Sequence, residues 1–147
     1  ASGVSVITMN DPEGNPVGFT ATSMTSLGAN PPLASFNVAS GASSWRAMNT
    51  AKFVAIHTLG QANIALAKKM AAAHELRFAE DDWIRGPYEV PVFTEASAVL
   101  IAKVREIHAI ESNAVVIVEI QEGLIGDEAE ALIYHQRAYK ATGRTLE

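Results

Sequence analysis

Residues 18–26 read Gly18-Phe19-Thr20-Ala21-Thr22-Ser23-Met24-Thr25-Ser26 and carry five hydroxyl side chains and no charge. The segment runs on to a di-proline, Pro31-Pro32, and then enters a new apolar run. Thr favours strands, and Gly, Asn and Pro favour turns, so one interpretation is a Thr-rich edge strand followed by a loop. The other is the wall of a pocket, whose neutral donors and close backbone N–H groups suit a phosphate or a polyhydroxylated chain.

The composition indicates one acidic domain without cysteine. The 147 residues are 48% hydrophobic, which is enough for one domain with a core, and no shift in composition marks a second. The formal charge of −5 provides no basic field, so nucleic acid and anionic membranes are not expected partners. The absence of cysteine excludes disulfides, thiolate catalysis and Cys-ligated zinc.

The sequence also bears on localisation and completeness. No apolar run reaches the ~18–20 residues of a membrane span and no signal peptide is visible, so we expect a cytoplasmic protein. The chain opens at Ala1 and enters a strand pattern within three residues. We therefore expect that residues 1–147 form a single domain from which an N-terminal piece is missing.

Strand patterns lie on both sides of the opening stretch. Residues 3–8 alternate, residues 10–16 are a dense turn signal, and residues 17–21 read as the hairpin partner. After the di-proline, residues 33–38 predict a third strand. Residues 52–59 are rich in β-forming side chains and predict a fourth.

Two helical segments are predicted beyond these strands. Residues 45–49 form a short turn of helix for which either Ser43 or Ser44 supplies the N-cap. Residues 61–73 read as a full helix, because Ala, Leu, Lys and Met dominate them. Residues 74–92 mix charge, aromatic residues and two prolines and predict a long ordered loop, which in a compact domain is usually functional or interfacial.

The last third of the chain returns to β structure. Residues 98–104 and 114–120 are strongly apolar strands with a turn region at residues 107–113, and residues 131–134 add a short final strand. The near-continuous apolar character indicates that both faces are covered, as in a barrel wall packed against a helix or a second subunit. Together the segments predict a small β-barrel decorated by helices.

Most catalytic signatures are missing. The chain has no G-x-S-x-G, H-E-x-x-H or P-loop lysine motif, and its four histidines lack ligand spacing, so we expect no metal site. His57 lies inside an apolar strand, which favours a hydrogen-bonded structural role. The acidic clusters at residues 81–82 and 128–130 read as solvated. A pocket without its own acid, base or nucleophile is expected where a cofactor carries the reaction.

An ordered set of segments runs along nearly the whole chain. It consists of residues 3–8, 18–26 and 30–33, Ser43 and Ser44, residues 53–59, the helix, Arg77 and Phe78, residues 132–135, Arg137 and Tyr139. This set resembles the flavin reductase-like family, the FMN-binding split barrels that include the NAD(P)H:flavin oxidoreductase partners of two-component monooxygenases. The resemblance implies a mainly β fold, a six-stranded split barrel of Greek-key-like topology with helical additions. It also implies a homodimer with flavin near the subunit interface.

The resemblance also implies which residues contact the flavin. The opening stretch would do so through Thr20, Ala21, Thr22, Ser23 and Ser26, whose hydroxyls can donate to ribityl or phosphate oxygens. The next strand would offer backbone groups and an amide to the polar edge of the isoalloxazine, from Phe36, Asn37 and Val38. Phosphate would suit Ser43 and Ser44 at a helix start, where unsatisfied N–H groups converge. For Arg46 and Tyr139 two interpretations stand side by side: pocket residues, or an ordinary solvated helix residue and a packing residue.

One departure from the family lies before the last long strand. Family reductases commonly carry a Gly-Asp-His triplet there, with the histidine near the nicotinamide or flavin, and this chain reads Glu111-Ser112-Asn113. Asn113 is the candidate nicotinamide contact, and its amide forms hydrogen bonds but carries no charge. His57 stands where many members have asparagine.

The expected function is NAD(P)H-dependent reduction of FMN or FAD by hydride transfer to flavin N5, with reduced flavin supplied to a partner monooxygenase. NADH or NADPH would be the donor, and no side chain would act as catalyst. The alternative is a flavin-binding or electron-carrier protein of the same fold without turnover, which the change at Asn113 favours. A third interpretation is a split barrel that holds haem or a deazaflavin.

Overall fold

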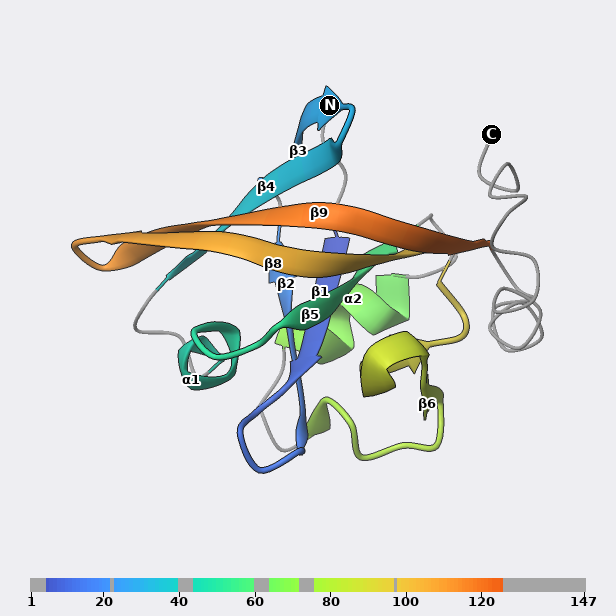
Figure 1. Cartoon of the computed structure of the whole chain (residues 1–147). Helices are drawn as coiled ribbons and strands as arrows, with labels where there is room; N and C mark the ends of the chain where they lie inside the picture. The colour runs from blue at the N-terminus through green and yellow to red at the C-terminus, as the bar shows by residue number, and fades with distance from the viewer. Residues whose placement is uncertain are drawn as a thin grey trace.

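Seven strands pair into one antiparallel sheet in the computed structural model, in the order β2-β1-β5-β8-β9-β4-β3 (Figure 1). Their bounds are β1 (Ser5–Asn10), β2 (Pro16–Ala21), β3 (Thr25–Ala29), β4 (Pro32–Ala39), β5 (Phe53–Thr58), β8 (Ala98–Ile110) and β9 (Asn113–Ile125). The structure describes residues 5–21, 23–39, 44–59, 64–71, 76–96 and 98–125. The predicted strand at residues 131–134 lies outside these ranges.

The sheet curls until β2 and β4 approach each other. Phe19 of β2 meets Phe36 of β4, with ring centroids 6.1 Å apart. The two strands share no ladder in the described part of the chain, because β2 pairs with β1 alone. We call this gap between β2 and β4 the seam. A mainly β split barrel with helical additions is thereby confirmed, with seven strands in the main sheet where six were predicted.

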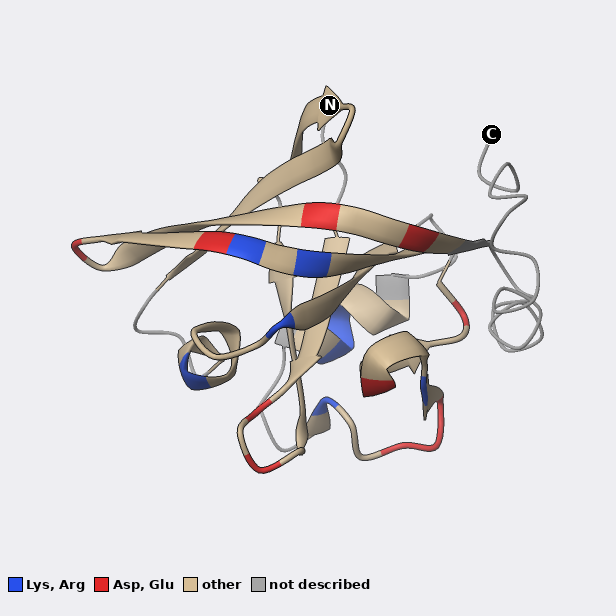
Figure 2. Ribbon diagram, viewed as in Figure 1, with Lys and Arg blue, Asp and Glu red and all other residues tan. Residues whose placement is uncertain are grey.

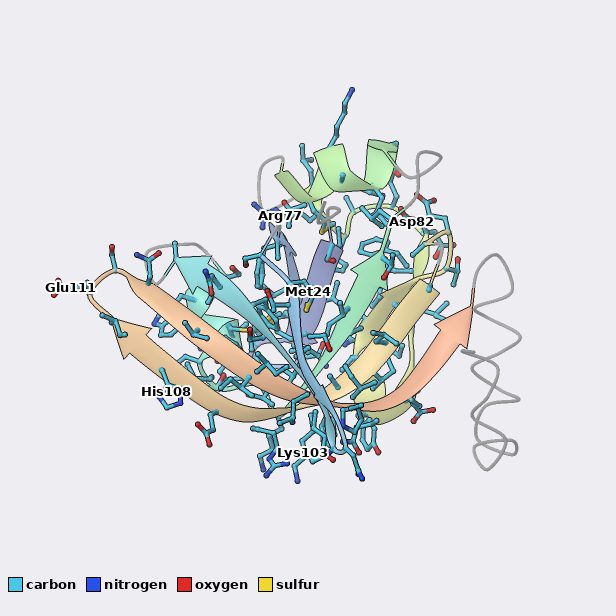
Figure 3. The ribbon with its side chains drawn as sticks, turned by 90° about the horizontal axis from the view of Figure 1, so that it is seen from above. Met24, Arg77, Asp82, Lys103, His108 and Glu111 are labelled. Atoms are coloured by element: carbon cyan, nitrogen blue, oxygen red, sulfur yellow. The ribbon has the colours of Figure 1, made fainter. Side chains whose placement is uncertain are left out.

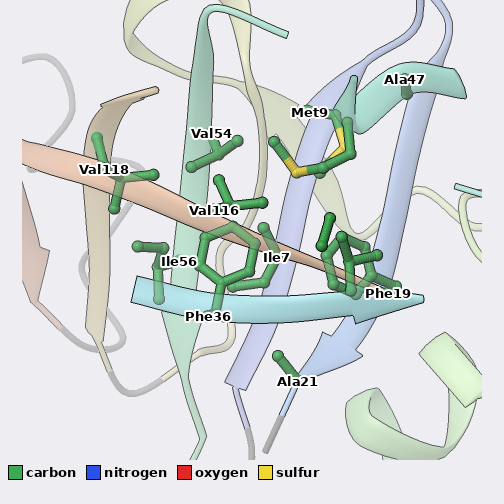
Figure 4. Packing of buried hydrophobic residues seen from close by; sticks show 14 of the residues in the cluster. Ile7, Met9, Phe19, Ala21, Phe36, Ala47, Val54, Ile56, Val116 and Val118 are labelled. Carbon is green, nitrogen blue, oxygen red and sulfur yellow. The ribbon is translucent and has the colours of Figure 1, made fainter. Parts of the chain in front are cut away.

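The inner faces of the strands form the core. Ile7 and Met9 are buried from β1, and Val116 and Val118 from β9, in each case two residues apart (Figure 4). This spacing is the period of a strand, so alternate side chains point into the barrel. Full burial of each such side chain contributes roughly 1.5–3 kcal/mol. Burial of every second side chain therefore accounts for the alternation of apolar residues from which the sequence predicts these strands.

The outer face of β1 and β2 is covered by helix α2 (Ile64–Ala71). Leu66 and Met70 of α2 are buried in a cluster with Val6. This helix lies within the predicted range of residues 61–73, and the one-turn helix α1 (Trp45–Met48) likewise matches its prediction. Within the described residues, none of the helices is long and apolar enough to span a membrane.

The segment predicted as a loop over residues 74–92 holds regular structure. Strands β6 (Trp83–Arg85) and β7 (Pro91–Phe93) pair with each other, and the short 3-10 helix η3 (Pro87–Glu89) joins them. Val90 and Val92 are buried against Ala55 of β5. The loop prediction was wrong here, because strands of three residues are too short for a periodic signal. The segment covers the outer face of β5 and the first half of β8.

The β8–β9 hairpin is longer than the apolar runs predict. Each strand has 13 residues, and the ladder continues to the pair Ile110 and Asn113. The turn contains two residues, of which Glu111 has a φ of 57°. The predicted turn region at residues 107–113 was therefore too wide. Polar residues such as His108 lie on a face of β8 that no described element covers, and they interrupt the apolar pattern.

Lys69 ties α2 to the segment that covers the sheet. Its ammonium forms ion pairs with Glu80, at 3.3 Å, and with Asp82, and it lies 5.4 Å from the centroid of the Phe93 ring. Because Lys69 is only 17% exposed, we expect Lys69→Met to lower the free energy of unfolding by about 1 kcal/mol. Urea unfolding of Lys68→Met, an exposed neighbour, provides the matched control and should match the parent. Equal losses for the two variants would contradict this role.

His57 is structural, as its position in an apolar strand predicts. The residue is fully buried, Nδ1 donates to the carbonyl oxygen of Val6 at 3.0 Å, and Nε2 accepts from the backbone N–H of Phe93 at 2.9 Å. These partners define the neutral tautomer with the proton on Nδ1. His57 therefore joins β1, β5 and β7.

Candidate functional site

A cavity of about 210 Å³ opens at the end of the barrel where β2 leads into the hydroxyl-rich stretch. We call it the mouth cavity. It is lined by Ser5, Met24, Ser26, Gly28, Pro32, Leu33, Ala34, Ile56, Thr58, Leu100 and Ile120. No residue of this described lining carries a charge, and its side-chain polar groups are hydroxyls. The cavity therefore suits an uncharged, mostly apolar group that accepts or donates a few hydrogen bonds.

The strand register explains how these residues meet. Ser5 lies opposite Thr58 at the ends of β1 and β5, and Ser26 of β3 lies opposite Ala34 of β4. Seen from above, Met24 lies inside the arc of strands (Figure 3). The opening stretch thus crosses the barrel end, and its residues after β2 reach the cavity.

Ser23 bridges the seam. Its Oγ accepts a hydrogen bond from the backbone N–H of Asn37 at 2.9 Å, and Thr25 Oγ1 donates to the Ser23 carbonyl oxygen at 3.2 Å. The N–H and C=O of one strand residue point to the same side, so the Asn37 carbonyl also faces the seam. The hydroxyl proton of Ser23 is left to donate to a ligand.

The residues of β2 itself do not line the mouth cavity. Thr20 lies two residues after Gly18 on the outer face, where it pairs with Val6 beneath α2. Ala21 is buried on the inner face. Within the opening stretch, Ser23 and Ser26 lie at the barrel end, whereas Thr20 lies on the outer face of β2. Thr22 lies outside the described residues.

Phe36 and Val38 are core residues whose side chains are buried. Their backbone groups point to β9, because those of Asn37 point to the seam and successive residues of a strand alternate, so neither residue offers a ligand a free group. Asn37, between them, is exposed on the outer face of β4.

Asn113 lies close to Asn37 across the sheet. It pairs with Ala39 of β4, and Val115, two residues further along β9, pairs with Asn37. Directly paired residues share a face, so Asn37 and Asn113 are diagonal neighbours on the outer face, within about 7–8 Å. The structure thus brings together two amide side chains that are 76 positions apart in the sequence.

Ser44 and Arg46 occupy different environments. Ser44 is 1% exposed, and its buried Oγ has no hydrogen-bond partner in the described structure. Arg46 forms an ion pair with Glu13 at 2.5 Å and approaches Asp11 at 4.0 Å, both in the β1–β2 turn. This turn is at the opposite end of the β1–β2 hairpin from Ser5 and the mouth cavity. Ser43 and Tyr139 lie outside the described residues.

The ion pair changes the ionisation of its members. Hydrogen bonding to Arg46 lowers the pKa of Glu13, and the same contact raises the pKa of Arg46. Both side chains are exposed, so the pair contributes little to stability. The structure therefore assigns Arg46 to the solvated surface of α1, the more ordinary of its two sequence interpretations.

Arg77 contacts the start of the opening stretch from outside the barrel. Its Nη1 donates to the carbonyl oxygen of Gly18 at 2.6 Å, and partial burial lowers its pKa (Figure 3). Other charged side chains lie on the turns, on the helices α1 and α2, and along β8 and β9 (Figure 2). The mouth cavity is a neutral region of an acidic molecule.

Sequence reasoning missed much of the lining of the mouth cavity. Met24, Leu33, Thr58, Leu100 and Ile120 lie in or next to strands whose alternation marks an inner face. That signal identifies a core position. It does not show that the core is open there, because openness depends on how the strands of the barrel end are staggered.

Comparison with known proteins identifies the family. The model of the flavin reductase like domain matches residues 1–143. An NADH:FMN oxidoreductase of Rhodococcus erythropolis is 35% identical over 146 residues, which cover 94% of this chain and 74% of that protein. The reductase subunit of stachydrine N-demethylase from Rhizobium meliloti is 43% identical over 95 residues, 65% of this chain and 41% of that protein. The chain thus spans less than half of one of these relatives and about three quarters of the other.

Solved structures agree with this result. A flavin reductase domain protein from an Arthrobacter species has a TM-score of 0.81 at 44% identity, over 85% of this chain and 77% of that chain. A homologue of nitrilotriacetate monooxygenase component B from Mycobacterium thermoresistibile has a TM-score of 0.78 at 25% identity, over 86% of this chain and 70% of that chain. Since the family model covers nearly the whole sequence, the chain belongs to the flavin reductase like family of oxidoreductases.

Proposed function

We propose that this chain binds a flavin across the mouth cavity and the seam and reduces it with NADH. The observation that carries the proposal is the neutral, hydroxyl-bearing mouth cavity beside the Ser23–Asn37 contact. An isoalloxazine is planar, mostly apolar and edged by amide-like groups, so this donor set fits it. The orphan Ser44 hydroxyl adds a buried polar atom that a phosphate-bearing ligand would satisfy.

The protein groups have binding and orienting roles in this proposal. Ser26 and the apolar lining of the mouth cavity would hold the ring system and exclude water. Ser23 and the Asn37 backbone would hydrogen-bond ligand atoms at the seam, and Asn113 would contact the nicotinamide from the neighbouring strand. The flavin, when bound, would supply the redox chemistry as the hydride acceptor for the nicotinamide. No described side chain of the cavity has to act as an acid or base.

FMN and NADH are the preferred pair in our proposal. A relative that covers most of this chain is named an NADH:FMN oxidoreductase. We further propose that reduced flavin passes to an oxygenase, since a structural relative is a monooxygenase component B homologue. FAD and NADPH are the competing ligands to test.

A homodimer is part of the same proposal. The outer face of β9 and the second half of β8 is uncovered in the described residues, and it exposes Ile110 (66%) and Val115 (36%). Lys103 and His108 point away from the barrel on this side (Figure 3). A second copy on this face would lie beside Asn113 and Asn37, near the proposed flavin edge. Sedimentation equilibrium of the purified chain tests this assembly.

The deciding experiment is anaerobic titration of the purified chain with NADH or NADPH in the presence of FMN, FAD or riboflavin. We expect the flavin's visible absorbance to bleach, fastest with NADH and FMN. A chain that binds flavin but oxidises neither nucleotide would not be a reductase. That outcome supports the flavin carrier without turnover, which the uncharged Asn113 favours.

Filling the mouth cavity should block flavin binding. Gly28 lines the cavity, and a Cβ there would meet only the Pro31 carbonyl oxygen, at 3.8 Å, so Gly28→Leu is compatible with the fold. We expect the Kd for FMN and for riboflavin to rise equally, by about tenfold or more, because both share the ring system. Ala29→Leu, on the same exposed strand but outside the cavity lining, is the matched control. Unchanged flavin binding by Gly28→Leu would show that the mouth cavity is not part of the flavin site.

The role of Ser44 is tested by comparing two ligands. Its buried hydroxyl has no described partner, so Ser44→Ala should leave the free energy of unfolding unchanged or slightly higher. If the hydroxyl serves a phosphate, the Kd for FMN rises about tenfold while that for riboflavin stays constant. Isothermal titration with the two ligands measures the difference. Equal changes for both would argue against a phosphate at Ser44.

A further inference from the structure

The turn at η3 holds two adjacent non-glycine residues in the left-handed region. Tyr88 has a φ of 57° and Glu89 a φ of 65°. Such a conformation is strained for a residue with a Cβ atom, so surrounding contacts must hold it. Two donors bind the Glu89 carbonyl oxygen, Asn10 Nδ2 at 3.0 Å and Arg85 Nη1 at 3.2 Å. Arg85 also bonds the Asn10 side chain and, at 3.1 Å, the Gly14 carbonyl oxygen.

This turn lays the Tyr88 ring on Phe53, the first residue of β5. The ring centroids are 3.8 Å apart and the planes differ by 2°, while Tyr88 stays 47% exposed. An aromatic pair so presented offers an apolar edge and face at the surface. It lies at the opposite end of β5 from Thr58 and the mouth cavity.

A second cavity of about 130 Å³ adjoins this stack. Its lining is Asn10, Ala51, Lys52, Phe53, Tyr88 and Val90. In an unrelated protein an engineered cavity of about 150 Å³ binds benzene, so a cavity of this slightly smaller size suits at most a single six-membered ring. The cavity shares no lining residue with the mouth cavity.

The polar groups of the lining indicate which ligand charge this cavity favours. Asn10 uses its amide nitrogen on Glu89 and its amide oxygen on Arg85. The side-chain groups that remain are the Lys52 ammonium and the Tyr88 hydroxyl, and Lys52 has no ion pair within the described residues. A lysine and an aromatic pair in one lining, with no carboxylate among the lining residues, are complementary to a planar aromatic anion.

We infer that this cavity is a second ligand site, separate from the flavin site, which takes a small aromatic carboxylate. The ring lies against the Phe53 and Tyr88 side chains, and the carboxylate accepts from the Lys52 ammonium. The strained turn keeps Tyr88 in place before the ligand arrives, which lowers the entropic cost of binding.

The test is an NMR titration of the full chain with benzoate, following backbone amide shifts. Benzoate should shift the amides of Phe53 and Tyr88 with one common Kd, and phenol, which lacks the charge, should bind more weakly. Lys52→Met should raise the benzoate Kd about tenfold and leave that of phenol unchanged. Lys68→Met, an exposed lysine outside this lining, should change neither.

Three results would overturn the site. Benzoate could cause no shifts up to its solubility limit, or it could shift the mouth cavity instead, around Ser26 and Ile120. It could also bind equally well to the parent and to Lys52→Met, which would show that the ammonium does not recognise the carboxylate.

Discussion

Replacing His57 by alanine should lower the free energy of unfolding by about 3–5 kcal/mol. The imidazole is fully buried, and its removal leaves a cavity between β1, β5 and β7. It also leaves the Val6 carbonyl oxygen and the Phe93 N–H without partners in a region that water does not reach. Chemical denaturation with circular dichroism measures the loss. A loss below about 1 kcal/mol would mean that neither hydrogen bond of the imidazole contributes to stability.

His57 should also make stability depend on pH. Burial lowers the pKa of its imidazole to about 4, from an ordinary value of 6.5. Between these pH values His57 is protonated in the unfolded chain and neutral in the folded chain. The free energy of unfolding therefore falls as the pH falls from about 6.5 to about 4. The contribution is complete above pH 6.5, and up to about 3 kcal/mol of it is lost by pH 4.

A matched variant isolates this titration. His57→Asn retains a donor and an acceptor but no group that titrates in this range. The difference in unfolding free energy between the parent and this variant should shrink when the pH is lowered from about 7.5 to about 5. A constant difference would show that the imidazole does not resist protonation in the folded state.

Gly18→Val should lower the free energy of unfolding by about 2–3 kcal/mol. A Cβ at Gly18 would lie 3.0 Å from Met70 Sδ, 3.1 Å from the Phe78 ring and 3.2 Å from Thr8 Cγ2. All three distances are shorter than ordinary van der Waals contact. Met70 belongs to α2, so the larger side chain must push the helix away from the sheet.

Gly18→Ala, with one added carbon, should cost about 1 kcal/mol, because the end of the Met70 side chain can shift by a few tenths of an ångström. Gly28→Ala is the control, since its Cβ would meet a single atom at 3.8 Å. Thermal unfolding should rank the three variants in this order. Equal melting temperatures for Gly18→Val and Gly28→Ala would show that α2 does not pack against this position.

The sequence predicts best where the signal is local. The β1–β2 hairpin follows from the turn residues between its strands, and Gly14 takes a φ of 88° in that turn. The helix α2 follows from composition. By contrast, β3 carries no signal, because all five of its residues are exposed and no alternation marks it. It is held by its pairing with β4, which is a tertiary contact.

The candidate site shows the same division. The hydroxyl groups of the opening stretch predict a polar pocket wall, and Ser23 and Ser26 lie at the barrel end. Composition does not say that Thr20 points the other way or that Arg46 pairs with Glu13. Both facts depend on the register of β2 and on where the β1–β2 turn meets α1.

By itself the sequence determined the β-rich class, the one full helix, the neutral character of the opening stretch and the resemblance to flavin reductases. These features reside in residue types and short spacings. The tertiary structure alone decided that Asn37 donates to Ser23, that Asn113 lies beside Asn37, and that the barrel end is open. Such contacts join residues far apart in the chain, and their geometry depends on strand order, which local periodicity does not encode.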